Sequence, residues 1–441
     1  MTAKGLIIAA PRSGSGKTSV AIGLMRALRR RNVNVKGAKS GPDYIDPGFH
    51  LAATGRPGIN LDSWAMHPAL LGRLAEATFS DTDLVVLESA MGLFDGIMAG
   101  EGRTGAAADL ARLLGLPSVL VLDVSGQSQT VAAVARGFAT HDPGVCIAGV
   151  VLNQVASERH RKYCVEAIER IGIPVVGTIF RNPEMALPER HLGLVQASEH
   201  AAIDHFIEKL ADIMEQSLDI DAILGLAKSG DFADSAAMDS VSLPPPGQRI
   251  AIARDKAFTF LYPHLLAEWR GAGAELVPFS PLADEAPEKD CDCCWLPGGY
   301  PELHAAVLAH SRNFSSGMRK FAETRPVHGE CGGFMVLGRA LEDADGNSHT
   351  MLGLLDHVTS FAKRKLNLGY RQATLKADCA IGRAGDIVRG HEFHYSRVTD
   401  SGSGEPLAEL SDGLGNAMGP AGGRRGLVTG SFFHAIARSR P

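Results

Sequence analysis

The first half of the chain alternates between short runs of consecutive apolar residues and longer stretches in which apolar residues recur every three or four positions. Short, mainly apolar runs, which are typical of buried strands, lie at residues 5–10, 84–88, 118–123, 145–152 and 175–179, and residues 33–38 are a further strand candidate. Helical periodicity lies between most of them, for example at 17–31, 158–170 and 199–214. Buried strands that alternate with helices predict a parallel sheet covered on both faces, with ligands at the carboxyl ends of its strands.

The periodic pattern stops near residue 222 and resumes near residue 249. Between them, consecutive prolines at 244–246 favour a stiff, extended connector. A second series follows, with strands expected at 249–254, 275–279 and 291–296 and a helix at 259–271. The sequence therefore predicts an α/β protein with a first domain at 1–221, a linker at 222–248 and a second domain at 249–441.

A loop of small residues joins the first predicted strand to the first predicted helix. Gly14 and Gly16 let backbone N–H groups approach phosphate oxygens closely, and the helix N-terminus adds partial positive charge. Lys17 brings a full charge to the β- and γ-phosphates, and the Thr18 hydroxyl is a candidate Mg²⁺ ligand. Because a strand and a helix flank it, we interpret the stretch as a nucleotide-binding phosphate loop rather than as a glycine-rich turn without a ligand.

The loop departs from the usual motif at its beginning. A glycine is expected five residues before Gly16, and Pro11 stands there instead, so the loop is a variant. Arg12 lies five residues before Lys17 and is a second candidate for a phosphate contact. Partition and cell-division ATPases carry a signature lysine at that place, so a nucleotide-switched assembly protein with a regulatory domain is one alternative function.

Carboxylates stand near the ends of other predicted strands. The loop Gly-Pro-Asp-Tyr-Ile-Asp-Pro-Gly contains Asp43 and Asp46, and Glu88 ends an apolar run. A buried carboxylate is costly unless it is paired or binds a metal. We therefore predict Mg²⁺ ligands here, namely Thr18, Asp43, Asp46 and Glu88. The alternatives are a solvated turn for the loop and a structural hydrogen bond for Glu88, and Asp95 equally fits the start of a turn.

Composition narrows the classes of protein. With a net charge of −5 and no long basic run, the chain does not fit a nucleic-acid-binding protein. It has no window of about 18 uninterrupted apolar residues, so no membrane span is expected. The N-terminus runs directly into a strand, so we expect no signal peptide. The 7 cysteines are an odd number scattered through a large chain, which favours a reducing cytoplasm.

A second centre lies around Cys331, in the stretch Val-His-Gly-Glu-Cys-Gly-Gly-Phe. A short predicted strand leads to the cysteine and a helix begins directly after it, which is the cysteine form of a nucleophile elbow. We expect the helix N-terminus to lower the pKa of the thiol. Backbone N–H groups of Gly332 and Gly299 are candidates to bind an oxyanion. The alternative is a buried structural cysteine.

A nucleophilic cysteine needs a base, and the base need not be near it in sequence. His391 and His394 are two candidates, in the stretch Gly-His-Glu-Phe-His-Tyr-Ser, and His434 is a third, in Phe-Phe-His. The spacing of these residues does not choose between them.

These motifs together carry a family resemblance over nearly the whole chain. The variant phosphate loop, Gly-Pro-Asp-Tyr-Ile-Asp-Pro-Gly, Glu-Ser-Ala-Met-Gly-Leu-Phe-Asp-Gly, Gly-Glu-Cys-Gly-Gly, Gly-His-Glu-Phe-His-Tyr-Ser and the late Phe-Phe-His resemble those of the cobyrinic acid and hydrogenobyrinic acid a,c-diamide synthases. The resemblance implies a first domain similar to dethiobiotin synthetase and a second similar to class I glutamine amidotransferases.

The resemblance also implies roles for residues. It assigns the base to His434 and leaves His391 to the surrounding site. Ordinary class I glutaminases have an acidic residue two positions after the histidine, where this chain has Ile436, so the group that orients His434 stays open. The resemblance further implies that Asn153 contacts adenine and that Lys39 and Asp43 are active-site positions. The positions expected near the substrate are Tyr44, Ile45 and Asp95.

The implied activity is the amidation of the a- and c-acetate carboxylates of a corrinoid through an acyl phosphate, with ATP, glutamine and Mg²⁺, by a cytoplasmic enzyme and expected homodimer. Candidate partners for the substrate carboxylates are Lys36, Lys39, Arg56, Lys363, Arg364 and Lys365, although a run such as 363–365 also fits a solvated face. An amidase of other corrinoid carboxylates, of the cobyric acid synthase type, is the second alternative. Whether the corrin carries cobalt stays open.

Overall fold

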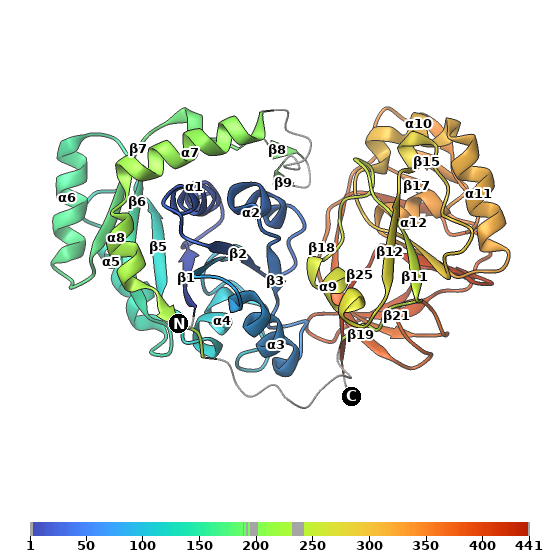
Figure 1. Cartoon of the computed structure of the whole chain (residues 1–441), viewed down its shortest axis with the longest axis horizontal. Coiled ribbons are helices and arrows are strands. Elements are labelled where there is room, and N and C mark those ends of the chain that lie inside the picture. The colour runs from blue at the N-terminus through green and yellow to red at the C-terminus, as the bar shows by residue number, and fades with distance from the viewer. Residues whose placement is uncertain (1–2, 188, 191–192, 195–201, 232–241, 440–441) are drawn as a thin grey trace. The chain divides into compact units, whose positions relative to one another are not determined.

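The computed structural model describes residues 3–187, 189–190, 193–194, 202–231 and 242–439. The chain divides into two compact units, Met1–Met238 and Asp239–Pro441 (Figure 1). Each unit is built around its own parallel sheet.

The first unit contains an 8-stranded sheet in the order β3-β2-β4-β1-β5-β6-β7, with β10 paired to β1 outside this path. The seven strands of the main path pair in parallel, and one helix connects each strand to the next along the chain. The strands are β1 (Lys4–Ala9), β2 (Val35–Ser40), β3 (Ile59–Leu61), β4 (Leu84–Glu88), β5 (Ser118–Asp123), β6 (Ile147–Val155) and β7 (Val175–Phe180). The helices are α1 (Lys17–Arg30), α2 (Asp46–Thr54), α3 (Pro68–Phe79), α4 (Ala107–Leu113), α5 (Val131–His141), α6 (Glu158–Glu169), α7 (Ile203–Ser217) and α8 (Ile220–Leu226).

Continuous burial of the central strands explains their sequence pattern. All five residues of β4 are buried, and so are all residues of β1 after Lys4. Strands covered on both faces have no polar side to display, which is why they read as uninterrupted apolar runs. The predicted fold class is therefore confirmed. The helix expected at 199–214 begins in residues outside the described part of the chain, and α7 runs from Ile203 to Ser217.

Part of the stretch predicted as a linker is structured. Residues of α8 pack against β6 and β7, and β10 (Lys228–Ser229) pairs antiparallel with β1. A seven-residue helix and a two-residue strand are too short to produce a clear periodicity, so the pattern did not reveal them. The expected linker therefore starts too early in the sequence, and its residues 232–241 lie outside the described residues.

The second unit contains a 6-stranded sheet in the order β12-β11-β13-β14-β24-β23, which is parallel except for the β23–β24 pair. Its strands are β11 (Arg249–Ala253), β12 (Glu275–Phe279), β13 (Cys293–Leu296), β14 (Val327–Glu330), β23 (Gly423–Arg425) and β24 (Val428–Ser431). The helices are α9 (Pro263–Gly271), α10 (Ala305–His310), α11 (Arg312–Ala322) and α12 (Gly332–Leu337). Short 3-10 turns lie at Pro183–Met185, Pro281–Ala283 and Pro301–His304.

Two antiparallel sheets complete the second unit. A 5-stranded sheet has the order β22-β21-β18-β19-β25, and a 4-stranded sheet, in which only β15 and β17 are parallel, has the order β16-β15-β17-β20. Their strands are β15 (Ala340–Glu342), β16 (Ser348–Thr350), β17 (Val358–Ser360), β18 (Asn367–Leu375), β19 (Ile387–His394), β20 (Arg397–Asp400), β21 (Ala408–Asp412), β22 (Ala417–Ala421) and β25 (His434–Ser439). A small pair, β8 (Glu189–Arg190) and β9 (Gly193–Leu194), belongs to the first unit.

None of the helices in the described part of the chain has the length and apolar character needed to cross a bilayer.

Two helix glycines of the first unit provide a matched test of its packing. A Cβ added to Gly23 of α1 would lie 2.8 Å from the carbonyl oxygen of Leu210 in α7, whereas one added to Gly137 of α5 would meet nothing within 4 Å. We expect G23A to destabilise the first unit by about 1–3 kcal/mol through overpacking. G137A should instead stabilise it by about 0.5–1 kcal/mol. Thermal unfolding followed by circular dichroism measures both; a G23A protein as stable as G137A would contradict the packing of α1 on α7.

Candidate functional site

The loop between β1 and α1 has the backbone of a phosphate-binding loop. Gly14 and Gly16 have φ of 78° and 88°, values that glycine adopts without strain. A Cβ added to Gly16 would lie 2.2 Å from Asn153 Nδ2, so a side chain there would displace the Asn153 amide. The Asn153 amide, at the end of β6, donates a 2.9 Å hydrogen bond to the Ser15 carbonyl oxygen. Asn153, which the resemblance places near adenine, thus holds the loop itself.

A buried network lies beside the loop, centred on the carboxylate of Glu88 at the end of β4. Glu88 Oε1 accepts hydrogen bonds from Thr18 Oγ1 at 2.5 Å and from Lys39 Nζ at 2.9 Å. Its other oxygen lies 2.9 Å from His50 Nε2. Lys39 also pairs with Asp46 at 2.5 Å. The structure therefore brings together three of the residues predicted for metal or substrate, in addition to Thr18.

Burial and the neighbouring charges explain the pKa shifts in this network. Burial lowers the pKa of Lys17, and the charge of Lys39 lowers it further. Burial opposes ionisation of Glu88, but Lys39 and His50 outweigh it and lower the pKa of the carboxyl group. Burial raises the pKa of Asp46, and the Asp43 carboxylate adds to the effect.

The Asp43 carboxylate closes the turn before α2. Its Oδ1 accepts hydrogen bonds from the backbone N–H groups of Ile45 at 2.8 Å and Asp46 at 2.9 Å. Ile45 is buried and Tyr44 is half-buried. In the described residues, no group of three or more His, Cys, Asp or Glu side chains is already arranged as a metal cage.

Two further predicted residues flank the loop. Arg12 is 65% exposed in its side chain and pairs with Asp123 at the end of β5, at 3.2 Å. Asp95 Oδ2 accepts a 2.8 Å hydrogen bond from the N–H of Gly92, and the Asp95 N–H donates to the Gly92 carbonyl oxygen at 3.1 Å, so Asp95 stands at the end of a turn rather than at its start. That turn lies against the phosphate loop, because Leu93 N–H donates to the carbonyl oxygen of Ala10 at 2.9 Å.

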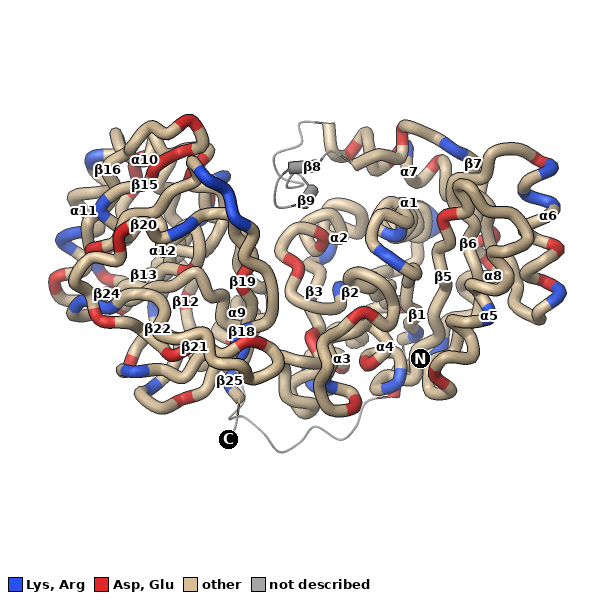
Figure 2. The backbone as a smooth tube through the Cα atoms, turned by 180° about the vertical axis from the view of Figure 1, so that it is seen from behind, with Lys and Arg blue, Asp and Glu red and all other residues tan. Residues whose placement is uncertain are grey.

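Two of the other proposed substrate cations, Lys36 and Arg56, lie at the opposite edge of the sheet in the first unit. Lys36 is near the start of β2 and donates to the Ser80 carbonyl oxygen, and Arg56 pairs with Asp81, three residues before β4. Both are therefore at the amino ends of the strands, opposite the phosphate loop. The expectation that they contact substrate carboxylates here is corrected, because a strand position alone does not show which end faces the site. The run at 363–365 is exposed. Figure 2 shows that lysine and arginine residues are spread over both units.

His50 is a site residue that the sequence analysis missed. It is fully buried on α2, and its Nε2 reaches Glu88. The available signal was its position four residues after Asp46, which places both side chains on one face of a helix.

The second centre is a strained turn between β14 and α12. Cys331 has φ of 48° and ψ of −104°, which is uncommon for a residue with a side chain. Its N–H donates to the Ser431 carbonyl oxygen at 2.8 Å, and its own carbonyl oxygen accepts from Met335 N–H at 3.0 Å. A Cβ added to Gly333 would lie 1.9 Å from the Leu296 carbonyl oxygen. These contacts have the form of the predicted elbow.

Backbone N–H groups gather next to the sulfur. The Gly332 N–H forms a hydrogen bond with the Cys331 side chain. A Cβ added to Gly332 would lie 3.0 Å from the backbone nitrogen of Gly299, so the two candidate oxyanion donors are neighbours.

Geometry separates the three candidate histidines. A Cβ added to Gly298 would lie 2.4 Å from His434 Cε1, 3.0 Å from His434 Nε2 and 3.2 Å from Cys331 Cβ. The His434 ring and the cysteine therefore border the same small space. His391 faces His434 across the β19–β25 pair, and His394 stacks on Phe432 with its Nδ1 3.0 Å from the Ser396 carbonyl oxygen. His434 is thus the best placed of the three to exchange a proton with the sulfur.

The predicted effect of the helix on the thiol is wrong. Burial raises the pKa of Cys331, with a further contribution from the Glu302 carboxylate that exceeds the lowering by the Gly332 N–H. The helix that follows has only 6 residues, and its terminal charge is correspondingly small. A raised pKa favours the thiol form of the resting sulfur, so the proton leaves as the sulfur attacks.

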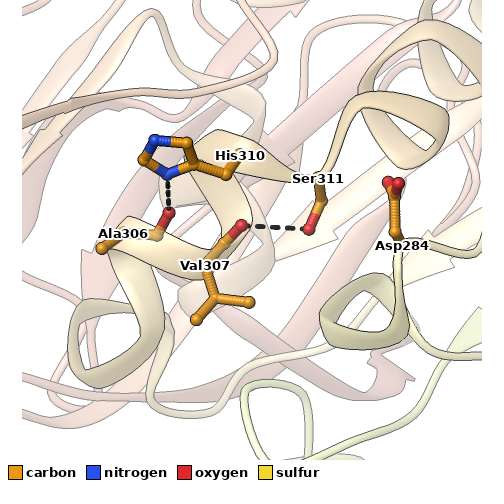
Figure 3. Close-up of a pocket in the computed structure, with 5 residues that line it drawn as sticks. All are labelled: Asp284, Ala306, Val307, His310 and Ser311. Carbon is orange, nitrogen blue, oxygen red and sulfur yellow. Dashed lines mark hydrogen bonds between the residues drawn. The ribbon is translucent and has the colours of Figure 1, made fainter.

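A hollow in the second unit lies beside α10, and its side chains are shown in Figure 3. His310 Nδ1 lies 2.6 Å from the Ala306 carbonyl oxygen, and Ser311 Oγ donates to that of Val307 at 3.0 Å. These polar groups thus bond to the helix itself, and Asp284 caps α11 by accepting from Phe314 N–H at 2.9 Å. The hollow contains none of the predicted catalytic residues.

Comparisons with known proteins match both units. Residues 6–195 match the family model of the CobQ/CobB/MinD/ParA nucleotide binding domain, and residues 249–441 match that of the CobB/CobQ-like glutamine amidotransferase domain. The fold and the two centres thus define a nucleotide-binding protein with a fused glutamine amidotransferase domain.

Relatives extend over the full length. The chain is 66% identical to the hydrogenobyrinate a,c-diamide synthase of Mesorhizobium japonicum, covering 100% of both chains. It is 63% identical to that of Agrobacterium fabrum, over 99% of this chain and 100% of the relative, and 52% identical to that of Rhodobacter capsulatus, over 98% and 99%. The chain belongs to the hydrogenobyrinate a,c-diamide synthase family.

The raised pKa of Cys331 predicts a slow resting thiol. At pH 7.5 we expect iodoacetamide to modify Cys331 at least about tenfold more slowly than the exposed Cys146, because alkylation needs the thiolate. The modification of Cys331 should accelerate as the pH rises. Mass spectrometry of peptides after timed quenching measures both rates, and preferential labelling of Cys331 at neutral pH would show a thiolate instead.

Proposed function

We propose that the protein converts hydrogenobyrinate to its a,c-diamide, using ATP and glutamine, in cobalamin biosynthesis. The observation that carries the proposal is that one chain holds both a phosphate loop with a buried Lys–carboxylate network and a cysteine elbow bordered by a histidine. The full-length relatives named for this activity support the choice of substrate. Neither a nucleotide switch nor a free-standing glutaminase needs both centres.

The second unit releases ammonia from glutamine. The Cys331 sulfur attacks the side-chain amide carbon while His434 takes the thiol proton, and the N–H groups of Gly332 and Gly299 stabilise the oxyanion that forms. His434 then gives the proton to the departing nitrogen, which leaves as ammonia, and a thioester remains. Water cleaves the thioester to release glutamate and restore the thiol.

The first unit activates the substrate. A carboxylate oxygen of an acetate side chain attacks the γ-phosphorus of ATP, the bond to ADP breaks, and an acyl phosphate forms. Lys17 and Lys39, with Arg12 at the edge of the loop, balance the charge spread over the transferred phosphoryl group. Ammonia then attacks the acyl carbon, phosphate leaves, and the amide remains.

The carboxylates beside the phosphate loop fit a divalent cation. Asp43, Asp46 and Glu88 lie near the ammonium groups of Lys17 and Lys39, and burial together with the Asp43 carboxylate raises the pKa of Asp46. We propose that Thr18, Asp43, Asp46 and Glu88 hold Mg²⁺, directly or through water. When bound, the ion would screen the phosphate oxygens.

We further propose that the protein works as a cytoplasmic homodimer that binds neither nucleic acid nor membrane. All 7 cysteines are free, which suits a reducing compartment. Sedimentation of the purified protein would give the number of subunits.

The division of labour predicts that C331A abolishes glutamine-dependent amidation, by about 1000-fold or more, and retains amidation with added ammonium chloride at high pH. K17A should lose amidation with glutamine and with ammonium chloride alike, because the substitution removes the positive charge that Lys17 brings to the ATP phosphates. Mass spectrometry of product from hydrogenobyrinate, with cobyrinate assayed in parallel, measures the outcome. Loss of both reactions in a folded C331A protein would contradict the assignment, and faster amidation of cobyrinate would overturn the choice of substrate.

The proposal of a Mg²⁺ site predicts that chelation affects amidation and glutamine hydrolysis differently. Removing Mg²⁺ with EDTA should stop amidation with either nitrogen source and leave glutamine hydrolysis within about twofold, because the cysteine site needs no cation. Glutamate release, measured beside amide formation, tests this. Equal loss of both activities would contradict it.

A further inference from the structure

Glu330 is a fully buried carboxylate immediately before the nucleophile. It ends β14 with 1% of its surface exposed, and it was not among the residues singled out from the sequence. Its Oε1 accepts a 2.9 Å hydrogen bond from the N–H of Ala435 in β25. Its Oε2 lies 3.5 Å from His434 Nδ1. The carboxylate is therefore fixed by the same strand that carries the histidine.

The two edges of the His434 ring face different groups. Nδ1 is on the side of Glu330, whereas Nε2 and Cε1 border Gly298, which also touches the space beside Cys331. A carboxylate at Nδ1 favours the tautomer with a proton on that nitrogen, which leaves the lone pair of Nε2 on the side of the sulfur. The carboxylate also stabilises the imidazolium that forms when the thiol proton is transferred.

Other charged groups near His434 do not offer this arrangement. Glu392 lies near the sulfur, but its Oε2 accepts a 2.7 Å hydrogen bond from Arg371. His391 and His394 face His434 from β19, and burial lowers their pKa to about 3 and about 4, so both are neutral at working pH. His434 Nδ1 makes an ion-pair contact with Glu330 Oε2, at 3.5 Å.

We propose that Glu330 is the positioning residue for His434, in place of the acid that other class I enzymes have two residues after the histidine. Here that position is Ile436, which is buried and apolar. The chain thus supplies the third member of the triad from the residue before the cysteine. The proposal rests on the proposed function, in which Cys331 and His434 hydrolyse glutamine.

The test is E330Q, because a glutamine side chain keeps an oxygen for the Ala435 N–H and presents an NH₂ group to Nδ1. That group favours the tautomer with its proton on Nε2, which cannot accept the thiol proton. We expect kcat for glutamine hydrolysis to fall about 100-fold or more, with KM for glutamine within about threefold. The acidic limb of the residual pH profile should move to lower pH, because the stabilising charge is gone. E330D, which keeps the charge, should recover part of the rate.

Controls separate this role from a structural one. Amidation with added ammonium chloride should be unchanged in E330Q, and E409Q, at an exposed carboxylate paired with Lys376, should hydrolyse glutamine like the parent. Nitrogen-15 spectra of labelled histidine, with H434N used for assignment, should show a proton on Nδ1 in the parent and on Nε2 in E330Q.

Three results would overturn the proposal. The first is an E330Q protein that hydrolyses glutamine with the rate and pH profile of the parent, which would leave the proposed function intact. The second is an E330D protein no faster than E330Q. The third is loss of ammonia-dependent amidation in E330Q, which would indicate a structural role. Failure of the parent itself to hydrolyse glutamine would instead overturn the proposed function.

Discussion

The carboxylate of Glu88 has no access to water, and the first unit is arranged around the groups that compensate its charge. Thr18 comes from the phosphate loop, Lys39 from β2 and His50 from α2, so a single buried acid ties three segments to the end of β4. Burying such a charge without partners would cost several kcal/mol. The network therefore holds the polar end of the sheet in a defined geometry before a nucleotide arrives.

The second unit meets a different constraint at the equivalent place. Its nucleophile lies at the carboxyl end of β14, in a backbone conformation that is unfavourable for cysteine. The glycines that follow it leave room for the turn, because the chain passes close to the backbone of Gly299 at Gly332 and close to β13 at Gly333. Both centres thus follow from the same property of parallel strands, whose carboxyl ends open on one edge. The centre in the first unit is stabilised by paired charges, and the centre in the second unit is stabilised by close backbone packing.

The sequence predicts the regular parts of this structure well, and the reasons are physical. Strands buried on both faces must be apolar throughout, and a phosphate loop or an elbow needs small residues at fixed spacings, so each leaves a local signal. Contacts between distant segments leave none. The pairing of β10 with β1, the contact of His50 with Glu88 and that of Glu330 with His434 all join residues from separate elements.

The error concerning Cys331 has a similar origin. The expectation of a low pKa considered the helix that follows the residue, which is local. The burial and the nearby carboxyl groups that decide the pKa come from the folded unit as a whole. Local sequence therefore gives the identity of a reactive group more readily than its protonation.

The burial and raised pKa of Cys331 also affect how fast the enzyme is oxidised. Peroxides oxidise thiolates far faster than thiols, so a raised pKa at Cys331 would slow its oxidation between turnovers. Oxidants would reach Cys146 first, since it is exposed and lies in the other unit. Oxidation of Cys146 would not alter the cysteine that hydrolyses glutamine. Glutamine hydrolysis would therefore be lost only after the surface cysteine has been oxidised.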